Sequence, residues 1–187
     1  MSSSRAFTID PHTGLLHPAR HCPSPNHGPR PAGTPIDLLV IHAISLPPGE
    51  FGGGWIDALF TNRLDPGAHP AFAPIADLHV SAHLLIDRQG SVTQYVPFQR
   101  RAWHAGRSSF AGRCECNDFS VGIELEGDDR TPFEEAQYDA LSRVVRALRH
   151  RYPRITPDRI VGHSDIAPGR KTDPGPAFDW QRLLGGL

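Results

Sequence analysis

The sequence predicts a single α/β domain in which helices pack on a central β-sheet. Its 187 residues suit one domain with a substantial core. Residues 36–42 form an apolar run typical of a strand buried on both faces, whereas residues 120–126 alternate between apolar and polar side chains. Residues 131–148 have the apolar period of a helix. Strands and helices mixed in this way indicate a sheet covered by helices.

The first predicted strand, 36–42, follows a proline and ends in a polar residue, His42. Residues 46–54 contain two prolines and four glycines, which predicts a loop, and residues 55–64 suit a short helix. Residues 65–77 are again typical of a loop. The segments 83–87 and 91–96 are predicted to form a β-hairpin that turns at Gly90.

In the predicted strand 120–126, Val121, Ile123 and Leu125 share one face, and Glu124 and Glu126 share the other. The segment 131–134 reads Thr-Pro-Phe-Glu, a capping box that predicts the start of the longest helix. Its inward stripe is expected to consist of Ala140, Leu141, Val144, Val145 and Leu148. Pro153 ends this helix, residues 159–163 suggest a short strand, and residues 176–184 a closing helix.

The N-terminal segment differs in composition from the rest of the chain. Residues 10–35 are rich in Pro, His and Gly and show no sustained period, so residues 1–35 are expected to form an irregular arm packed on the domain that residues 36–187 build. The first ten residues lack the apolar core of a secretory signal, which predicts a cytoplasmic protein.

Composition excludes several classes of function. The formal net charge is −1, so there is no basic footprint for nucleic acid. No apolar stretch approaches the roughly 20 residues that span a bilayer. The three cysteines are expected to be reduced thiols, although Cys114 and Cys116 also leave a Cys-x-Cys metal site open as the weaker alternative.

Three side chains suggest a metal site. His42 ends a buried strand, His163 follows another apolar segment, and Asp173 lies in a loop rich in Pro and Gly. Two imidazoles and one carboxylate leave a position open in a tetrahedral zinc sphere, the pattern of a catalytic site. Spacing alone is weak evidence, because the chain has eleven histidines and most histidines are solvated or hydrogen-bonded in a core.

Two further charged residues are candidates for catalysis. Glu124 on the polar face of its strand could take a proton from water near a metal; pairing with one of the many arginines explains it equally well at this stage. Lys171 is the only lysine beside eighteen arginines and stands two residues before Asp173. A single lysine in such a chain suggests a position that requires a compact ammonium group.

Longer motifs resemble a known family. Residues 40–42 read Val-Ile-His, residues 101–106 read Arg-Ala-Trp-His-Ala-Gly, and residues 170–176 read Arg-Lys-Thr-Asp-Pro-Gly-Pro. Together with 44–53, 55–60, 80–83, 94–98, 116–120 and 122–127, they resemble the cytoplasmic 1,6-anhydro-N-acetylmuramyl-L-alanine amidases of bacterial cell-wall recycling. These belong with the zinc N-acetylmuramoyl-L-alanine amidases, whose fold, shared with phage lysozyme-type amidases and peptidoglycan recognition proteins, has a central mixed sheet flanked by helices.

The resemblance implies a zinc-dependent amidase that cuts the bond between the lactyl group of (1,6-anhydro-)N-acetylmuramic acid and L-alanine of the stem peptide. It implies Glu124 as the catalytic base and Lys171 as the group that stabilises the oxyanion, and it places Trp103 near the substrate. The remaining implied residues are the zinc ligands His42, His163 and Asp173, and His104 as a second substrate-binding residue.

The implied partner is a small anhydro-muropeptide, with no nucleic acid, membrane or protein partner. Two alternatives stay open. One is a non-catalytic peptidoglycan-binding module on the same fold, because fold alone does not decide activity. The other is an enzyme of the same chemistry that acts on polymeric wall outside the inner membrane.

Overall fold

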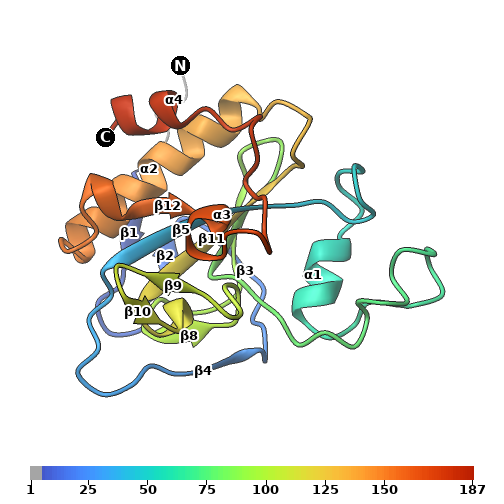
Figure 1. Ribbon diagram of the computed structural model, residues 1–187, viewed down its shortest axis with the longest axis horizontal. Coiled ribbons are helices and arrows are strands. Elements are labelled where there is room, and N and C mark those ends of the chain that lie inside the picture. Colours follow the sequence, from blue (N-terminus) through green and yellow to red (C-terminus); the bar gives the residue numbers. More distant parts are fainter. Residues whose placement is uncertain (1–5) are drawn as a thin grey trace.

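A computed structural model describes residues 6–187 and is built around a mixed six-stranded sheet (Figure 1). The strands lie in the order β12 (Ile160–Gly162), β5 (Leu38–Ile44), β11 (Ser120–Glu126), β6 (Leu84–Ile86), β7 (Val92–Gln94) and β3 (Arg20–His21). The first four strands run parallel, and β7 runs antiparallel to β6. The predicted mixed sheet with flanking helices is confirmed, and β6 and β7 form the predicted hairpin, with Gly90 at a φ of 78°.

The other elements surround this sheet. The helices are α1 (Trp55–Phe60), α2 (Glu135–Arg151), α3 (His163–Ile166) and α4 (Trp180–Gly185), with 3-10 turns η1 (Cys116–Asp118) and η2 (Pro157–Arg159). The short strands are β1 (Thr8–Ile9), β2 (Leu16–His17), β4 (His27–Pro29), β8 (Arg100–Ala102), β9 (Ser109–Phe110) and β10 (Arg113–Cys114). Among residues 6–187, no helix has the length and apolar content needed to cross a bilayer.

Helix α2 packs on the sheet through the predicted stripe. The five residues of that stripe are all buried, and they share a core with the odd-numbered residues of β11. Figure 1 shows α2 and α4 side by side over the sheet, and residues of both helices belong to this core. Each fully buried Leu or Val side chain contributes roughly 1.5–3 kcal/mol, so this contact is a main source of stability.

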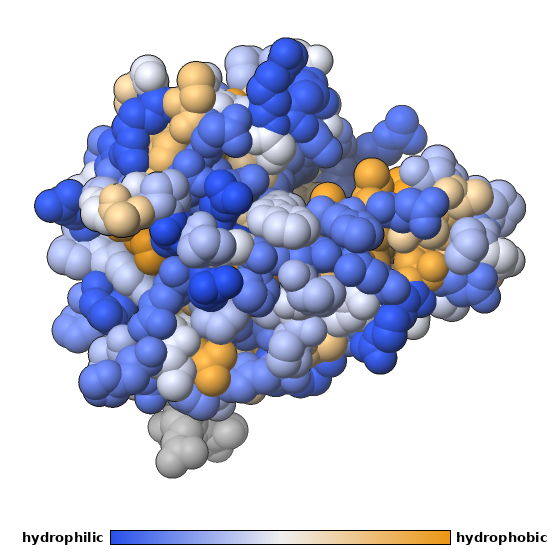
Figure 2. Space-filling model, turned by 90° about the horizontal axis from the view of Figure 1, so that it is seen from below, coloured by the Kyte–Doolittle hydropathy of each residue, from blue (hydrophilic) through white to orange (hydrophobic). Residues whose placement is uncertain are grey.

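Helix α1 belongs to a separate lobe with its own core. Ile56, Leu59 and Phe60 of α1 pack with Phe72 and Tyr95, away from α2 (Figure 1). Figure 2 shows apolar surface gathered over this lobe, on a face that is otherwise mostly hydrophilic. The helix is shorter than the predicted 55–64, because the chain turns into the left-handed region, with a φ of 57°, at residue 62.

Helix α2 begins later than predicted. We expected its start at the Thr131–Glu134 box, but its N-cap is Glu134, whose backbone N–H donates to Gln137 Oε1. The Thr131 N–H instead donates to Asp128 Oδ1 in a turn, and Phe133 enters the core before the helix starts. The closing helix likewise starts at residue 180, capped by Asp179, and residue 163 begins α3 instead of ending a strand.

The N-terminal arm contains more regular structure than its composition suggested. Its strand β3 extends the main sheet beside β7, and β4 pairs with β8. Arg30 joins the arm to the domain, because its largely buried guanidinium donates to four backbone carbonyls, those of Phe98, Asn117, Asp118 and Ser120. Residues 1–5 of the predicted arm lie outside the described residues, and the boundary at residue 35 stays a prediction.

Candidate metal centre and active site

The site lies where β5, β11 and β12 deliver polar side chains to one edge of the sheet. His42 of β5 is directly opposite Glu124 of β11, and His163 follows β12 as the first residue of α3. Asp173 reaches the same place from the loop that follows α3. Its own backbone carbonyl accepts a hydrogen bond from the Ser164 N–H at 3.0 Å. Gly162 permits this approach, since a Cβ there would lie 2.9 Å from Pro174 Cδ.

The three predicted metal-binding side chains meet in a triangle. His42 Nδ1 lies 3.0 Å from His163 Nδ1 and 3.1 Å from Asp173 Oδ2, and His163 Nδ1 lies 3.0 Å from the same carboxylate oxygen. Donor atoms about 2.0–2.1 Å from a tetrahedral zinc ion would lie roughly 3.3 Å from one another. Within residues 6–187 this is the one cluster of His, Cys, Asp and Glu with such convergence, and neither Cys114 nor Cys116 belongs to it.

The proton positions at the triangle suit a cation. His163 Nε2 lies 3.1 Å from the Ala105 carbonyl oxygen, which only accepts, so the proton of the neutral ring is on Nε2 and the lone pair of Nδ1 faces the triangle. Burial lowers the pKa of His42 to about 4, which keeps its ring neutral. Burial also acts to raise the pKa of Asp173, but contacts with His163 and His42 outweigh it and hold this pKa below its usual value. Two imidazole nitrogens and a carboxylate oxygen that converge in this way fit a divalent metal ion.

Glu124 is the unpaired acid of the site. Its Oε2 is buried and has no hydrogen-bond partner among the described residues. It lines a recess of about 220 Å³ together with His42, His163, Lys171 and Asp173. Burial raises the pKa of Glu124 well above its usual value, and the charge of Asp173 adds to the shift. Among residues 6–187, no arginine pairs with Glu124, the alternative that the sequence left open.

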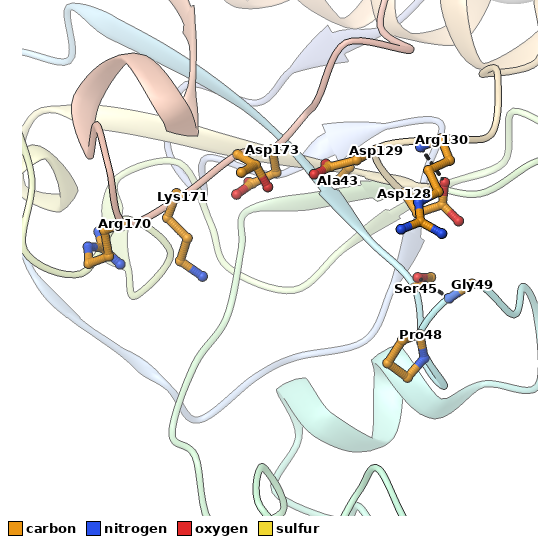
Figure 3. A pocket seen from close by; sticks show the side chains of 12 residues that line it. Ala43, Ser45, Pro48, Gly49, Asp128, Asp129, Arg130, Arg170, Lys171 and Asp173 are labelled. Carbon is orange, nitrogen blue, oxygen red and sulfur yellow. Dashed lines mark hydrogen bonds between the residues drawn. The ribbon is translucent and has the colours of Figure 1, made fainter.

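Lys171 stands between this recess and a larger cleft of about 500 Å³. Figure 3 shows Lys171 and Asp173 at one end of the cleft, with Asp128 and Arg130 at the other. The Lys171 side chain is exposed, so its ammonium group is accessible to a molecule that enters the cleft. The cleft thus presents charges of both signs beside the triangle.

Trp103 and His104 both line the recess, but His104 differs from a simple contact residue. Its Nδ1 lies 2.9 Å from His42 Nε2, and its Nε2 lies 3.1 Å from Ser120 Oγ. Both ring nitrogens of His104 therefore contact other residues of the protein, and its predicted role in substrate binding stays a prediction. Nothing in the local sequence indicated Ser120 or the Ala105 carbonyl, since their contacts join segments distant along the chain.

Comparison with known proteins agrees with this geometry. Residues 32–176 match the model of the N-acetylmuramoyl-L-alanine amidase family. The 1,6-anhydro-N-acetylmuramyl-L-alanine amidase AmpD of Enterobacter cloacae is 64% identical over 170 residues, which are 91% of this chain and 90% of that protein. A crystal structure of an AmpD derivative superimposes with a TM-score of 0.92 at 57% identity, covering 96% of this chain and 98% of the other.

A more distant relative has been solved with a substrate. The N-acetylmuramyl-L-alanine amidase AmiD from Escherichia coli, in complex with anhydro-N-acetylmuramic acid-L-Ala-D-γ-Glu-L-Lys, is 34% identical, with a TM-score of 0.62. The match covers 83% of this chain and 59% of that one. The match to the family model spans most of the chain, and the identity with AmpD extends over nearly its whole length. This chain therefore belongs to the N-acetylmuramoyl-L-alanine amidase family.

Proposed function

We propose that the chain is a zinc-dependent amidase of peptidoglycan recycling that cuts anhydro-muropeptides between the lactyl group of 1,6-anhydro-N-acetylmuramic acid and L-alanine. The amidase activity itself follows from membership of the family and from the high identity with AmpD. The observation that carries the mechanism is the triangle of His42, His163 and Asp173 beside an unpaired buried carboxylate.

The metal centre has a defined role in this proposal. His42, His163 and Asp173 hold the ion, and a zinc ion in such a site supplies Lewis acidity and lowers the pKa of water bound to it. The family as a whole is the reason to name zinc among the divalent ions that this donor set accepts. His163 is held in place by its Nε2–H, which donates to Ala105, so the orientation of this ligand does not depend on the ion.

Glu124 moves the proton. Its Oε2 takes a proton from the attacking water and returns it to the nitrogen of the departing L-alanine. Because no described residue forms a hydrogen bond with this oxygen, it is free for both transfers. Burial favours the protonated form, which suits a group that must also act as an acid.

Lys171 stabilises negative charge on the former carbonyl oxygen of the lactyl group. Its side chain lines both the recess and the larger cleft, where the scissile bond would lie beside the triangle. A mobile ammonium on a flexible stem follows the oxygen as the carbon becomes tetrahedral, whereas a planar guanidinium would present its donors in a fixed plane. Trp103 also lines the recess and offers an aromatic face to the sugar.

The substrate class rests on the relatives. The AmpD proteins are named for 1,6-anhydro-N-acetylmuramyl-L-alanine, and AmiD was solved with an anhydro-muropeptide bound. The cleft of about 500 Å³, with Arg130 and Asp128 opposite Lys171, accommodates a short peptide that carries carboxylates and an ammonium group. A cytoplasmic location is part of the proposal because the recycling amidases that this chain resembles act there.

One experiment tests the activity and the metal together. The chain is incubated with an anhydro-muropeptide and with intact peptidoglycan, and products are identified by mass spectrometry before and after dialysis against a chelator. We expect release of the free stem peptide from the anhydro-muropeptide, loss of activity on chelation, and recovery with zinc. Indifference to chelation would refute the metal centre. A zinc-loaded chain that binds muropeptide without cutting it would instead support the non-catalytic binding module.

A further inference from the structure

Two consecutive residues lie behind both proposed imidazole ligands. His42 Nε2 meets His104 Nδ1 at 2.9 Å, and His163 Nε2 meets the Ala105 carbonyl at 3.1 Å. The nitrogen of each imidazole that points away from the triangle therefore contacts the segment 104–105. Because the ring orientation of a metal-binding histidine depends on what its other nitrogen contacts, this segment is placed to control both ligands at once.

The segment is fixed from two sides. Asn117 Oδ1 accepts from the backbone N–H groups of both His104 and Ala105, at 3.1 and 2.8 Å. The His104 ring also rests directly on β11, since a Cβ on Gly122 would lie only 2.5 Å from His104 Cγ. The φ of Gly122 is not in the left-handed region, so space for this ring is the reason that β11 has a glycine there.

The hydrogen-bond directions follow from the proposed metal centre, on which this inference rests. When His42 Nδ1 faces a cation it carries no proton, so the proton of the neutral ring is on Nε2. That N–H donates to His104 Nδ1, which must accept. The remaining proton of a neutral His104 is then on its Nε2, which donates to Ser120 Oγ at 3.1 Å. Each assigned ring proton therefore fixes the direction of the next hydrogen bond.

We propose that His104 is a positioning residue for the metal ligand His42, held by Ser120 in the tautomer that accepts the His42 Nε2–H. The Ala105 carbonyl, held in place by Asn117, orients His163 in the same way. One loop therefore fixes the orientation of both imidazole rings. His104 touches neither substrate nor reacting atoms, and its contribution is to the affinity and geometry of the metal site.

Zinc affinity is the direct test. The zinc dissociation constant is measured by competition with a chromophoric chelator for the wild-type chain and for His104→Ala, His104→Asn and Ser120→Ala. We expect His104→Ala to weaken zinc binding by roughly 10–100-fold, the usual cost of losing such a partner. His104→Asn places an amide oxygen near the position of Nδ1 and should recover most of this affinity. Ser120→Ala should give a smaller loss, because His104 keeps its contact with His42.

Controls separate positioning from folding. His150→Ala removes an exposed histidine of α2 and should leave the zinc affinity unchanged. The melting temperature of each metal-free variant records any loss of stability by itself. A merely structural role for His104 would lower that temperature in His104→Ala and His104→Asn alike without changing zinc affinity, and this result would overturn the proposal.

A second measurement needs no variant. Long-range ¹H–¹⁵N spectra of the zinc-loaded wild-type chain report which ring nitrogen of each histidine carries the proton. We expect His104 with an unprotonated Nδ1 and a protonated Nε2; a proton on Nδ1 would refute the relay even if every variant failed to fold. A wild-type chain that binds no zinc would contradict the proposed function, whereas normal zinc binding in His104→Ala would contradict the positioning role alone.

Discussion

Glu124 and Glu126 stand two residues apart on the same side of β11, and their surroundings predict opposite consequences when each is replaced. Glu126 Oε1 accepts from the Gly52 N–H at 2.5 Å, and its Oε2 accepts from the Arg88 N–H at 3.3 Å. Glu124 Oε2 is buried without a partner among the described residues. The Glu126 carboxylate thus accepts from backbone amides of two loops, whereas Glu124 keeps an oxygen that no described residue contacts by a hydrogen bond.

The substitutions Glu126→Gln and Glu124→Gln preserve shape and remove charge. In Glu126→Gln, one acceptor oxygen becomes an amide nitrogen that faces a backbone N–H. A hydrogen bond to a charged group contributes about 1.5–3 kcal/mol, so we expect the free energy of unfolding to fall by about that amount. For a chain of this length the melting temperature would fall by roughly 3–12 °C. Turnover should stay within about tenfold of wild type, because Glu126 does not line the recess beside the triangle.

In Glu124→Gln no hydrogen bond is lost, and a buried carboxyl group, whose charged form burial disfavours, is replaced by a neutral amide. The free energy of unfolding should therefore be unchanged or higher than that of wild type. Loss of a general base lowers the rate by roughly 10²- to 10⁴-fold, which is about 3–5.5 kcal/mol in the activation barrier. The pair of variants should thus separate stability from turnover. Glu126→Gln should lose mainly stability, and Glu124→Gln should lose only turnover.

The assay combines urea unfolding of both metal-free variants with turnover of the zinc-loaded forms, measured as release of stem peptide. Zinc affinity is measured for each variant, so that a loss of metal is not mistaken for a loss of the base. If Glu124→Gln kept wild-type turnover, or lost as much stability as Glu126→Gln, the assignment of the base to Glu124 would be wrong.

Other residues give further predictions. Lys171→Arg should lower turnover by roughly 10²-fold or more with zinc affinity unchanged, whereas Arg130→Lys at the far end of the cleft should change turnover less than about fivefold; steady-state kinetics compare them. Arg30→Ala should lower the free energy of unfolding by about 3–5 kcal/mol, measured in urea, because it leaves buried carbonyls without donors. Burial lowers the pKa of His83 well below its usual value, so unfolded chains bind a proton that folded chains do not. Stability should therefore fall as the pH drops below about 6.5, by at most about 1.4 kcal/mol per pH unit from this group, and His83→Asn should flatten that slope in pH-dependent unfolding.

Elements with a strong local period could be predicted from the sequence, and those that depend on distant partners could not. The apolar run of β5 and the alternation of β11 identify strands because burial acts directly on those side chains. The predicted start of α2 was wrong because two local signals compete. The turn at Asp128 uses the Thr131 N–H, so the apparent capping box at Thr131 does not form and the helix begins after Glu134. Strands β3 and β4 of the arm escaped prediction because their partners, β7 and β8, lie more than sixty residues away.

The same distinction applies to the site. His42, His163 and Asp173 were identified as candidate ligands because they follow apolar segments or lie in a special loop, and the structure brings them together. The register between β5 and β11 could not be predicted, so the sequence alone did not place His42 opposite Glu124. The contacts of His104 with His42 and Ser120 could not be predicted either, because these partners come from two different strands.

Strand β11 explains how so many roles fall within one short segment. Its odd-numbered residues face the core beneath α2, and its even-numbered residues all face the other side. Along that side, the Ser120 hydroxyl contacts the His104 ring and Gly122 makes room for it. Further along, Glu124 lines the recess beside the triangle, and Glu126 accepts from two loop amides. A slip of one residue against β5 would bury the carboxylates under α2 and turn the apolar residues toward the triangle of His42, His163 and Asp173. The packing of α2 on this strand therefore fixes the alignment of the site, which is why the buried carboxylate of Glu124 can be held in place although its Oε2 has no hydrogen-bond partner among the described residues.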